Sequence, residues 1–411
     1  MASQRITARK LWWDTDMQIE SHSSGEPLAV GESGFTIIEL LVTLVISSLL
    51  AIAAFAFYLS TNNIINNENN VNAMWQRGRM AMAFIRESVE SAGFGLPQNV
   101  CPNGTYAYDS ATGARVLNLV PISASVQSGS SSYPYDPTQL SGIGTYSLTA
   151  IAGGGAIGDG AAAQVVSIPS TQSADMVLSN DSLVNSNDLF VVQTSGGVCL
   201  FGQITSVNQG GGNANQGGGN ANQNVVHNSG ESIFNPSGGF SALDGNLSTN
   251  QFVNANFYDE GQTGFYIDTF SIANPNGSTG VPTLYVTQST FASTSQATPQ
   301  AVARGIVDIQ ILYGVANGTL TGAVQQWITP ALYNATSNGA ILAVKVAILA
   351  RTTIPAQNQT SQPSYDLLGQ VFKVPSSGGQ AQGCQNGNCQ AYTYHVFEET
   401  IPVRNAIWGE S

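Results

Sequence analysis

Charged residues are scarce in this chain, and basic residues are the scarcest of them. Lys and Arg number 12 among 411 residues, against 25 Asp and Glu. Without the first 34 residues the balance is nine against twenty. Proteins that bind nucleic acid need clustered Lys and Arg to neutralise phosphates. The composition therefore indicates no nucleic-acid partner, and direct DNA capture is not expected.

Catalytic and metal-binding motifs are missing as well. The sequence has no G-x-S-x-G elbow and no H-E-x-x-H pair, and His227 and His395 stand without ligand spacing. Glu398 and Glu399 are adjacent in a predicted strand, so their side chains point to opposite faces. The Gly-rich runs lack the Lys-Ser/Thr of a phosphate-binding loop. We predict no enzyme activity, no catalytic residue, no cofactor and no metal.

One long apolar segment is present, GFTIIELLVTLVISSLLAIAAFAFYL, from Gly34 to Leu59. It is long enough to cross a hydrocarbon core of about 30 Å as a helix, and we predict a transmembrane segment over 37–59. Its one charge is Glu39, which costs about 2.5–3.5 kcal/mol at the centre of a membrane helix. A partner is therefore expected. The helix N-terminus and a new α-amine, formed by cleavage after Gly34, are the two candidates.

The start of this segment, Gly34 followed by Phe35-Thr36-Ile37-Ile38-Glu39-Leu40, resembles the type IV prepilin signature G|FTLIEL. The resemblance implies that residues 1–34 are a leader removed after Gly34 by the prepilin peptidase. Phe35 would become the N-terminal residue and be N-methylated. Glu39 would neutralise the N-terminal amine of an adjacent subunit during assembly. The alternative is an ordinary signal anchor, with Glu39 near the membrane interface.

Two features depart from familiar members of that family. The leader is long, and its basic residues all lie far from the span; a start at Met17 would shorten it but leave it without Lys or Arg. Ser48 and Ala56 stand where major pilins of the type IVa class carry a Gly and a Pro. We therefore expect a continuous membrane helix, which suits a minor subunit better than a shaft subunit.

The helix is predicted to continue beyond the membrane, giving a pilin helix over 35–93. The Asn-rich segment from Thr61 to Asn72 has poorer helix formers and predicts a weak point. Gly93 is the expected C-cap, since Gly95 and Pro97 follow it. The apolar residues that recur mostly at three- and four-residue steps, typical of a helix packed on a globular head, are Val71, Met74, Trp75, Gly78, Ala81, Met82, Ile85, Val89 and Ala92.

From Tyr106 onward, short apolar runs alternate with Gly, Pro, Asn and Ser, which predicts an antiparallel β-rich head over 94–411. Residues 150–163 and 208–224 lack core potential, and the second contains NQGGGNA twice in tandem. Both are expected to be flexible inserts. The predicted fold class is α+β, a long N-terminal helix packed on this head. Candidate strands are Val116–Ile122, Gln164–Ile168, Asp188–Gln193, Val198–Val207, Gln251–Tyr258, Gly264–Ile272 and Thr283–Gln288.

All four cysteines, Cys101, Cys199, Cys384 and Cys389, follow the predicted span. If this part lies in the periplasm, disulfides are permitted, and four cysteines allow three connectivities. The Asn-Gly turn signal between Cys384 and Cys389 favours a disulfide between these two residues. By elimination, Cys101 would then be bonded to Cys199. Free buried thiols are the alternative, and a zinc site is less favoured because Cys-x4-Cys lacks a second ligand pair.

Segments near the C-terminus resemble PilW-type minor pilins. AVARGIVDIQILYGV at 301–315 resembles "vaeGVedlqvqYGv", the run 340–352 resembles "avrvsLLvRs", and ETIPVRN at 399–405 resembles "tvplRN". AGFG at 92–95 is similar to the family's "AGyxG", although Glu90 stands where the family has an Arg. We expect the run around Ile306 to be core packing and Arg404 to pair with a carboxylate.

The resemblance implies a minor pilin of a type IV pilus that takes part in priming assembly and sits at or near the filament tip. The implied partners are the prepilin peptidase, other minor pilins, the major pilin, the inner-membrane assembly platform, and membrane lipid along 37–59. The implied location is the inner membrane, crossed once with the head in the periplasm, and then the pilus or cell surface. The alternatives are a J-type pseudopilin of a type II secretion system and a pilus-tip adhesin.

Overall fold

The computed structural model divides the chain into two compact units, Met1–Thr61 and Asn62–Ser411. The residues that the structure describes are 35–94, 105–109, 113–117, 120–127, 144–153, 163–179, 184–208, 223–228, 231–274, 280–290, 298–316, 323–356, 361–375, 384 and 388–404. The leader and residues 154–162 and 209–222, which make up most of the two predicted inserts, lie outside them.

Helix α1, Ile37–Ser91, contributes residues to both units. In the first unit every residue from Phe35 to Ser60 is exposed. In the second unit one face of the helix is buried, at three- and four-residue steps as the sequence predicted. Residues 61–72 are helical, so the poor helix formers there do not end the helix. Gly93, with φ of 81°, follows the last turn, and its amide donates to the carbonyl of Ile151.

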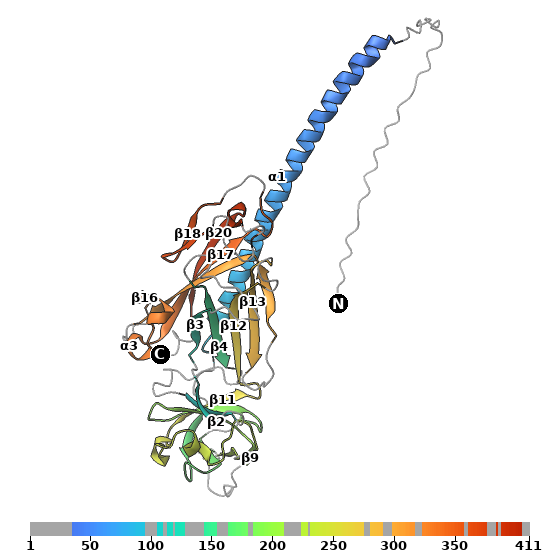
Figure 1. Ribbon diagram of the computed structural model, residues 1–411. Helices are drawn as coiled ribbons and strands as arrows, with labels where there is room; N and C mark the ends of the chain where they lie inside the picture. The colour runs from blue at the N-terminus through green and yellow to red at the C-terminus, as the bar shows by residue number, and fades with distance from the viewer. Residues whose placement is uncertain are drawn as a thin grey trace, which may run out of the picture. The chain divides into compact units, whose positions relative to one another are not determined.

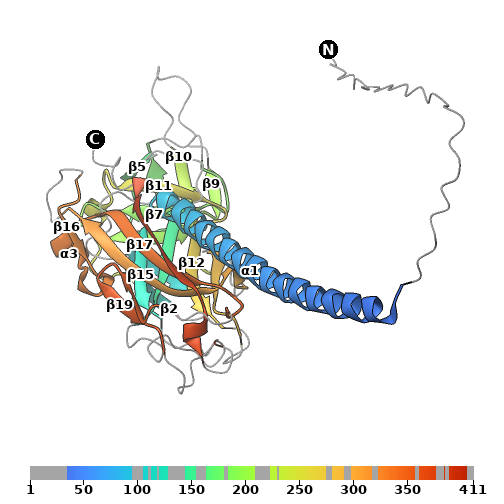
Figure 2. The same cartoon turned by 90° about the horizontal axis from the view of Figure 1, so that it is seen from above.

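Two antiparallel sheets surround the second half of α1. The five-stranded sheet has the order β14-β13-β12-β4-β3, and the four-stranded sheet has the order β16-β15-β17-β20. The first sheet consists of β3 Ile122–Val126, β4 Tyr146–Gly153, β12 Phe265–Ala273, β13 Thr283–Thr290 and β14 Gln300–Arg304. The second consists of β15 Ile306–Val315, β16 Gln326–Ile328, β17 Ile341–Arg351 and β20 Tyr394–Pro402. In Figure 2 the end of α1 lies among these strands.

A nine-stranded sheet, with the order β2-β1-β8-β7-β11-β5-β6-β10-β9, forms a separate lobe of the second unit (Figure 1). Its pairs are antiparallel except β1 with β8, which is parallel. The fold class is therefore α+β with antiparallel sheets, as predicted, apart from this one pair. The strands are β1 Thr105–Asp109, β2 Gly113–Leu117, β5 Ala163–Ser167, β6 Asp175–Leu178, β7 Leu189–Gln193, β8 Cys199–Gln203, β9 Ser206–Asn208, β10 Gln223–Val226 and β11 Asn256–Gly261.

The remaining elements are short. Strands β18 Ser364–Leu367 and β19 Gln370–Lys373 form a hairpin. The other short elements are helix α3 Ala335–Asn338 and the 3-10 turns η1 Gly239–Ala242, η2 Thr249–Gln251, η4 Pro330–Leu332 and η6 Cys389–Ala391.

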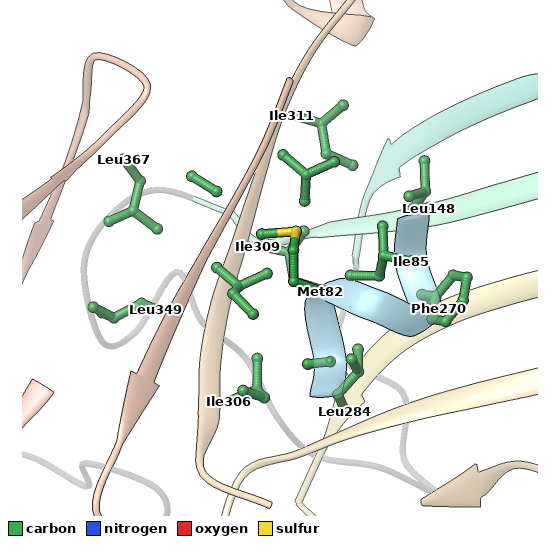
Figure 3. Packing of buried hydrophobic residues seen from close by; sticks show 14 of the residues in the cluster. Met82, Ile85, Leu148, Phe270, Leu284, Ile306, Ile309, Ile311, Leu349 and Leu367 are labelled. Carbon is green, nitrogen blue, oxygen red and sulfur yellow. The ribbon is translucent and has the colours of Figure 1, made fainter. Parts of the chain in front are cut away.

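The largest core joins α1 to both sheets that surround it. Met82 and Ile85 of α1 lie between Ile309 of β15 on one side and Leu148 and Phe270 of the five-stranded sheet on the other (Figure 3). All of these side chains are 5% exposed or less. Since fully burying one such side chain contributes about 1.5–3 kcal/mol, this core fixes α1 within the second unit. The run around Ile306 is core packing, as expected.

The nine-stranded lobe has cores of its own. One lies between β5, β6, β7, β8, β10 and β11 and includes Phe190, Phe240 and Phe257. A further core includes Phe201 together with Ile151 of β4 and Phe265 of β12. Strands β4 and β12 thus carry side chains of both the lobe and the core around α1. The sequence analysis predicted one β-rich head over 94–411 and did not predict that the head has separate cores.

Most predicted strands overlap observed ones, but three predictions were wrong in position. The run Val198–Val207 contains two strands, because β8 ends at Gln203 and β9 begins at Ser206. The run Val116–Ile122 is not one strand, because β2 ends at Leu117 and β3 begins at Ile122. Pro121 immediately precedes β3, and a proline has no N–H for a sheet ladder. The run Gln251–Tyr258 begins in a 3-10 turn, and β11 starts only at Asn256.

Candidate processing and assembly site

The first turn of α1 is closed by a reciprocal pair of side chains. The backbone N–H and the hydroxyl of Thr36 each donate to Oε2 of Glu39, both at 3.0 Å. In return, the backbone N–H of Glu39 donates to Oγ1 of Thr36 at 3.3 Å. This is the arrangement of a capping box, which satisfies N–H groups that have no partner within the helix. It holds the one carboxylate of residues 35–61 at the positive end of the helix dipole.

The capping pair lies directly beside the predicted cleavage position. Phe35 is 84% exposed and precedes Thr36, while Gly34 lies outside the described residues. An α-amine on Phe35 would stand one residue from the amide that already donates to Glu39. The arrangement can therefore present a carboxylate to a cation at the end of this helix or of a neighbouring one. The proposed cleavage, methylation and assembly roles of Gly34, Phe35 and Glu39 stay predictions.

The surface behind the capping pair is apolar. Among the described residues, α1 is the one helix long and apolar enough to cross a membrane, and the qualifying stretch buries none of its side chains within the chain. Exposed side chains there include Phe35, Leu41, Ile52 and Phe57, all more than half exposed. Exposed apolar patches of this extent mark membrane or protein interaction sites.

In the second unit, α1 is tied to the last described strand. The guanidinium of Arg86 donates to both carboxylate oxygens of Glu399 on β20, at 2.6 Å each. Arg404 pairs with Glu90 of α1 at 2.7 Å. Arg404 thus has a carboxylate partner, as expected, but the partner comes from the helix and the Arg404 side chain is 60% exposed.

An aromatic cluster packs on the same part of the helix. Trp75 lies 3.8 Å from His395 and 5.2 Å from Phe397, measured between ring centroids. A methyl group on Gly78 would overlap the ring of Phe397, so the absence of a side chain permits this contact. His395 is therefore part of a packing cluster. Burial lowers its pKa, which keeps it neutral at neutral pH.

The disulfide favoured by the sequence is present. Cys384 is bonded to Cys389, with their Cα atoms 5.1 Å apart. Cys199 is also disulfide-bonded, whereas its predicted partner Cys101 lies outside the described residues. Beside the first bridge, Arg351 is buried and donates to the sulfur of Cys384 at 2.8 Å, and its guanidinium lies over the ring of Tyr392.

Three buried carboxyl groups were missed by sequence reasoning. Burial raises the pKa of Asp259 to about 6, of Asp308 to about 7 and of Glu260 to about 9. Asp308 accepts a hydrogen bond from the side chain of Gln310 at 3.0 Å. Neither carboxyl oxygen of Glu260 has a hydrogen-bond partner among the residues that the structure describes. For Asp308 the sequence offered one signal, an acid inside the apolar run IVDIQIL. Such a run predicts that the acid is buried, but it does not predict how burial changes the pKa of the carboxyl group.

No arrangement for catalysis or metal binding is found in the described part of the chain. His227 is buried between Phe190 and Phe240, and burial lowers its pKa to about 4. Glu399 pairs with Arg86 while Glu398 is exposed, so the two adjacent acids do not share a site. No group of three or more His, Cys, Asp or Glu side chains converges among the described residues.

An exposed apolar helix that begins with a prepilin-type turn and continues into a β-rich head defines a pilin-like protein. Comparison with known families gives the same class and a more specific one. Residues 31–55 match the prokaryotic N-terminal methylation motif. Residues 269–405, from β12 to the end of the described chain, match PilW, the type IV pilus-assembly protein W.

These two matches support a minor pilin of the PilW family with a prepilin signature, as the resemblance of the sequence implied. The PilW match covers the four-stranded sheet around α1 and, in the five-stranded sheet, β13, β14 and part of β12. It leaves out β3, β4 and the nine-stranded lobe. The comparison with curated proteins and the comparison with solved structures each gave no match.

Proposed function

We propose that this protein is a minor pilin that is cut between Gly34 and Phe35 by the prepilin peptidase and then takes part in priming assembly at the tip of a type IV pilus. The observation that carries the proposal is the combination of an exposed apolar helix with a carboxylate fixed at its first turn. Before assembly, residues 37–59 hold the chain in the inner membrane, and the head lies in the periplasm. Partners are the major pilin, other minor pilins and the assembly platform.

The capping pair explains how Glu39 can serve two states. In the membrane, the hydrogen bonds from Thr36 and the helix dipole offset part of the cost of the carboxylate. During assembly, the α-amine of a neighbouring Phe35 takes the place of one of these donors. A charge-assisted hydrogen bond of this kind is roughly twice as strong as a neutral one. The membrane-embedded apolar surface is transferred at the same time onto other pilin helices.

N-terminal mass spectrometry tests the processing step. The protein is isolated from cells with and without the prepilin peptidase. We expect a mature chain that begins at N-methylated Phe35 in the first case and the uncut chain in the second. An uncut N-terminus in both strains would contradict the proposal and leave an exported β-rich head on a signal anchor.

Substitution of Glu39 tests the assembly step. Glu39→Ala is expected to be cut normally but to be lost from sheared filaments, because its helix has no carboxylate for the neighbouring amine. Glu68→Ala, at an exposed acid of the same helix, is the matched control and should enter filaments. Equal incorporation of both variants would contradict the role given to Glu39.

The pseudopilin alternative makes a different prediction for the same variants. A J-type pseudopilin would be required for secretion of folded proteins and would be absent from sheared pili. The PilW match favours the pilus. Loss of secretion in Glu39→Ala, in cells whose pili are unaffected, would instead assign the protein to the secretion system.

A further inference from the structure

The arginines of the second unit differ in their partners. Arg86 and Arg404 each pair with a carboxylate, and Arg351 is buried against Cys384 and Tyr392. Arg77, Arg79 and Arg304 form no ion pair with any residue of the described chain. The guanidinium of Arg79 lies over the ring of Trp75, 5.7 Å from its centroid. In a protein with more than twice as many acids as bases, arginines without a carboxylate partner are unexpected.

Arg77 and Arg304 both lie near Thr353, two residues after the end of β17. The guanidinium of Arg77, which is half-buried, donates to the hydroxyl of Thr353 at 3.4 Å. Arg304 is exposed and is followed by Gly305, where an added methyl group would lie 3.6 Å from the side chain of Thr353. Burial lowers the pKa of Arg77, and the positive charge of Arg304 lowers it further. The two guanidinium groups are therefore close enough to repel each other.

Exposed apolar side chains continue this surface along α1. Met80 is 43% exposed and Phe84 is 46% exposed. They lie three and seven residues after Arg77, positions that share a helix face with it. We call Arg77, Met80, Phe84, Arg304 and Thr353 the Arg77 surface. It combines two cationic groups with two large apolar groups, and Met, Phe and Arg are enriched in protein interfaces.

The chemistry of a partner follows from this combination. A guanidinium offers a planar fork of donors that matches a carboxylate, often with two parallel hydrogen bonds. The single contact of Arg77 with Thr353 leaves most of its donors available and holds the side chain in place. Because the rest of the chain is acidic, an acidic partner is repelled elsewhere and attracted here, which sets its orientation.

We propose that the Arg77 surface binds an acidic segment of a partner protein, with one or two carboxylates placed between Arg77 and Arg304 and apolar side chains placed on Met80 and Phe84. This surface lies within the second unit and does not involve the capping pair at Glu39. That the partner is another pilus subunit rests on the proposed function; the chemistry of the contact does not.

Photocrosslinking in living cells tests the proposal. The full chain carries p-benzoylphenylalanine in place of Phe84, and the crosslinked peptide is identified by mass spectrometry. We expect a protein peptide that contains Asp or Glu beside apolar residues. R77E/R304E should lower the crosslink yield about tenfold, the change expected for the loss of about 1.4 kcal/mol of binding. Lys373→Glu, which reverses one charge at an exposed residue of β19, should leave the yield unchanged.

Each remaining outcome has a defined meaning. A crosslink only to lipid, no crosslink at all, a peptide without acids, or equal yields in R77E/R304E and Lys373→Glu would overturn the proposal. If R77E/R304E loses protease resistance, R77Q/R304Q replaces it and must lower the yield in the same direction. Charge reversal of the crosslinked acid should restore the yield in R77E/R304E.

The same samples separate this proposal from the proposed function. Cleavage after Gly34 is measured on each chain by its N-terminal mass. Normal cleavage with no acidic partner at Phe84 overturns only the Arg77 surface. An uncut chain that still crosslinks to an acidic protein overturns the pilin role and keeps the surface.

Discussion

The two parts of helix α1 obtain their stability in opposite ways. From Phe35 to Ser60 every residue is exposed, and the side-chain hydrogen bonds of this part are local, such as those between Thr36 and Glu39. From Met74 to Val89 one face is buried between two sheets, and Arg86 and Glu90 pair with residues near the chain end. The first part makes no burying contact within the described chain, whereas the second part packs against strands of the same chain.

The difference teaches which sequence signal belongs to which environment. A helix that is apolar all round is suited to lipid or to complete burial, and a helix with one apolar stripe is suited to a protein core. Both patterns occur in α1 without a break in the helix at the Asn-rich segment. Mutations should therefore act on the head only when they fall in the second part.

The largest expected effect comes from a core truncation. Ile85→Ala removes a fully buried side chain of α1 and should lower the free energy of unfolding of the head by about 2–5 kcal/mol. Leu50→Ala, at an exposed position of the first part, should change it by less than about 0.5 kcal/mol. Urea unfolding of both purified variants in mild detergent measures the difference. Similar losses would contradict the division between the two parts.

The pH dependence of stability should come from the second unit. Burial raises the pKa of Asp308 from its ordinary value of 3.8 to about 7. The folded protein therefore keeps a proton that the unfolded chain releases, and the free energy of unfolding falls as the pH rises from about 4 to 7. The loss from Asp308 alone is on the order of 4 kcal/mol, and Asp259 and Glu260 act in the same direction.

Asp308→Asn isolates this contribution. The amide stays neutral, so unfolding between pH 4 and 8 should depend less steeply on pH than in the unsubstituted protein. Glu398→Gln, at an exposed acid of β20, should leave the slope unchanged. A slope that Asp308→Asn does not reduce would show that Asp308 stays ionised in the folded head.

A smaller effect is expected where α1 approaches β20. In Gly78→Ala the new methyl group meets the ring of Phe397, and the strain of about 1–3 kcal/mol exceeds the gain in helix propensity of up to about 1 kcal/mol. Thermal unfolding should therefore shift downward. Gly245→Ala, with no heavy atom within 4 Å of the added group, is the control. Phe397→Leu should recover part of the loss in Gly78→Ala, and no recovery would contradict this cause.

Sequence reasoning was most successful where the signal is local. The apolar segment, the stripe of α1, the Gly93 cap and the Cys384–Cys389 bridge each depend on residues a few positions apart. The prepilin signature likewise lies within seven consecutive residues. In each of these cases the spacing along the chain already fixes the spacing in space.

Features that depend on distant residues could not be predicted. The contact of Arg86 with Glu399 joins residues 313 positions apart, and neither residue has a motif that identifies the other. The same applies to the parallel pairing of β1 with β8 and to the division of the head into separate cores. The Arg77 surface becomes visible only when three elements, α1, the β14–β15 junction and the end of β17, are placed together.

The joining of α1 to the last strand also sets an order of events during folding. The core around α1 is incomplete until β15, β17 and β20 have been made, and these follow the helix by more than two hundred residues. Contacts of high sequence separation form slowly. The strands of the nine-stranded lobe are all made earlier and have cores of their own, so this lobe can fold while the helix face is still uncovered. A newly made chain is therefore expected to pass through a stage in which the stripe of α1 that is buried in the folded head is open to chaperones or to premature association.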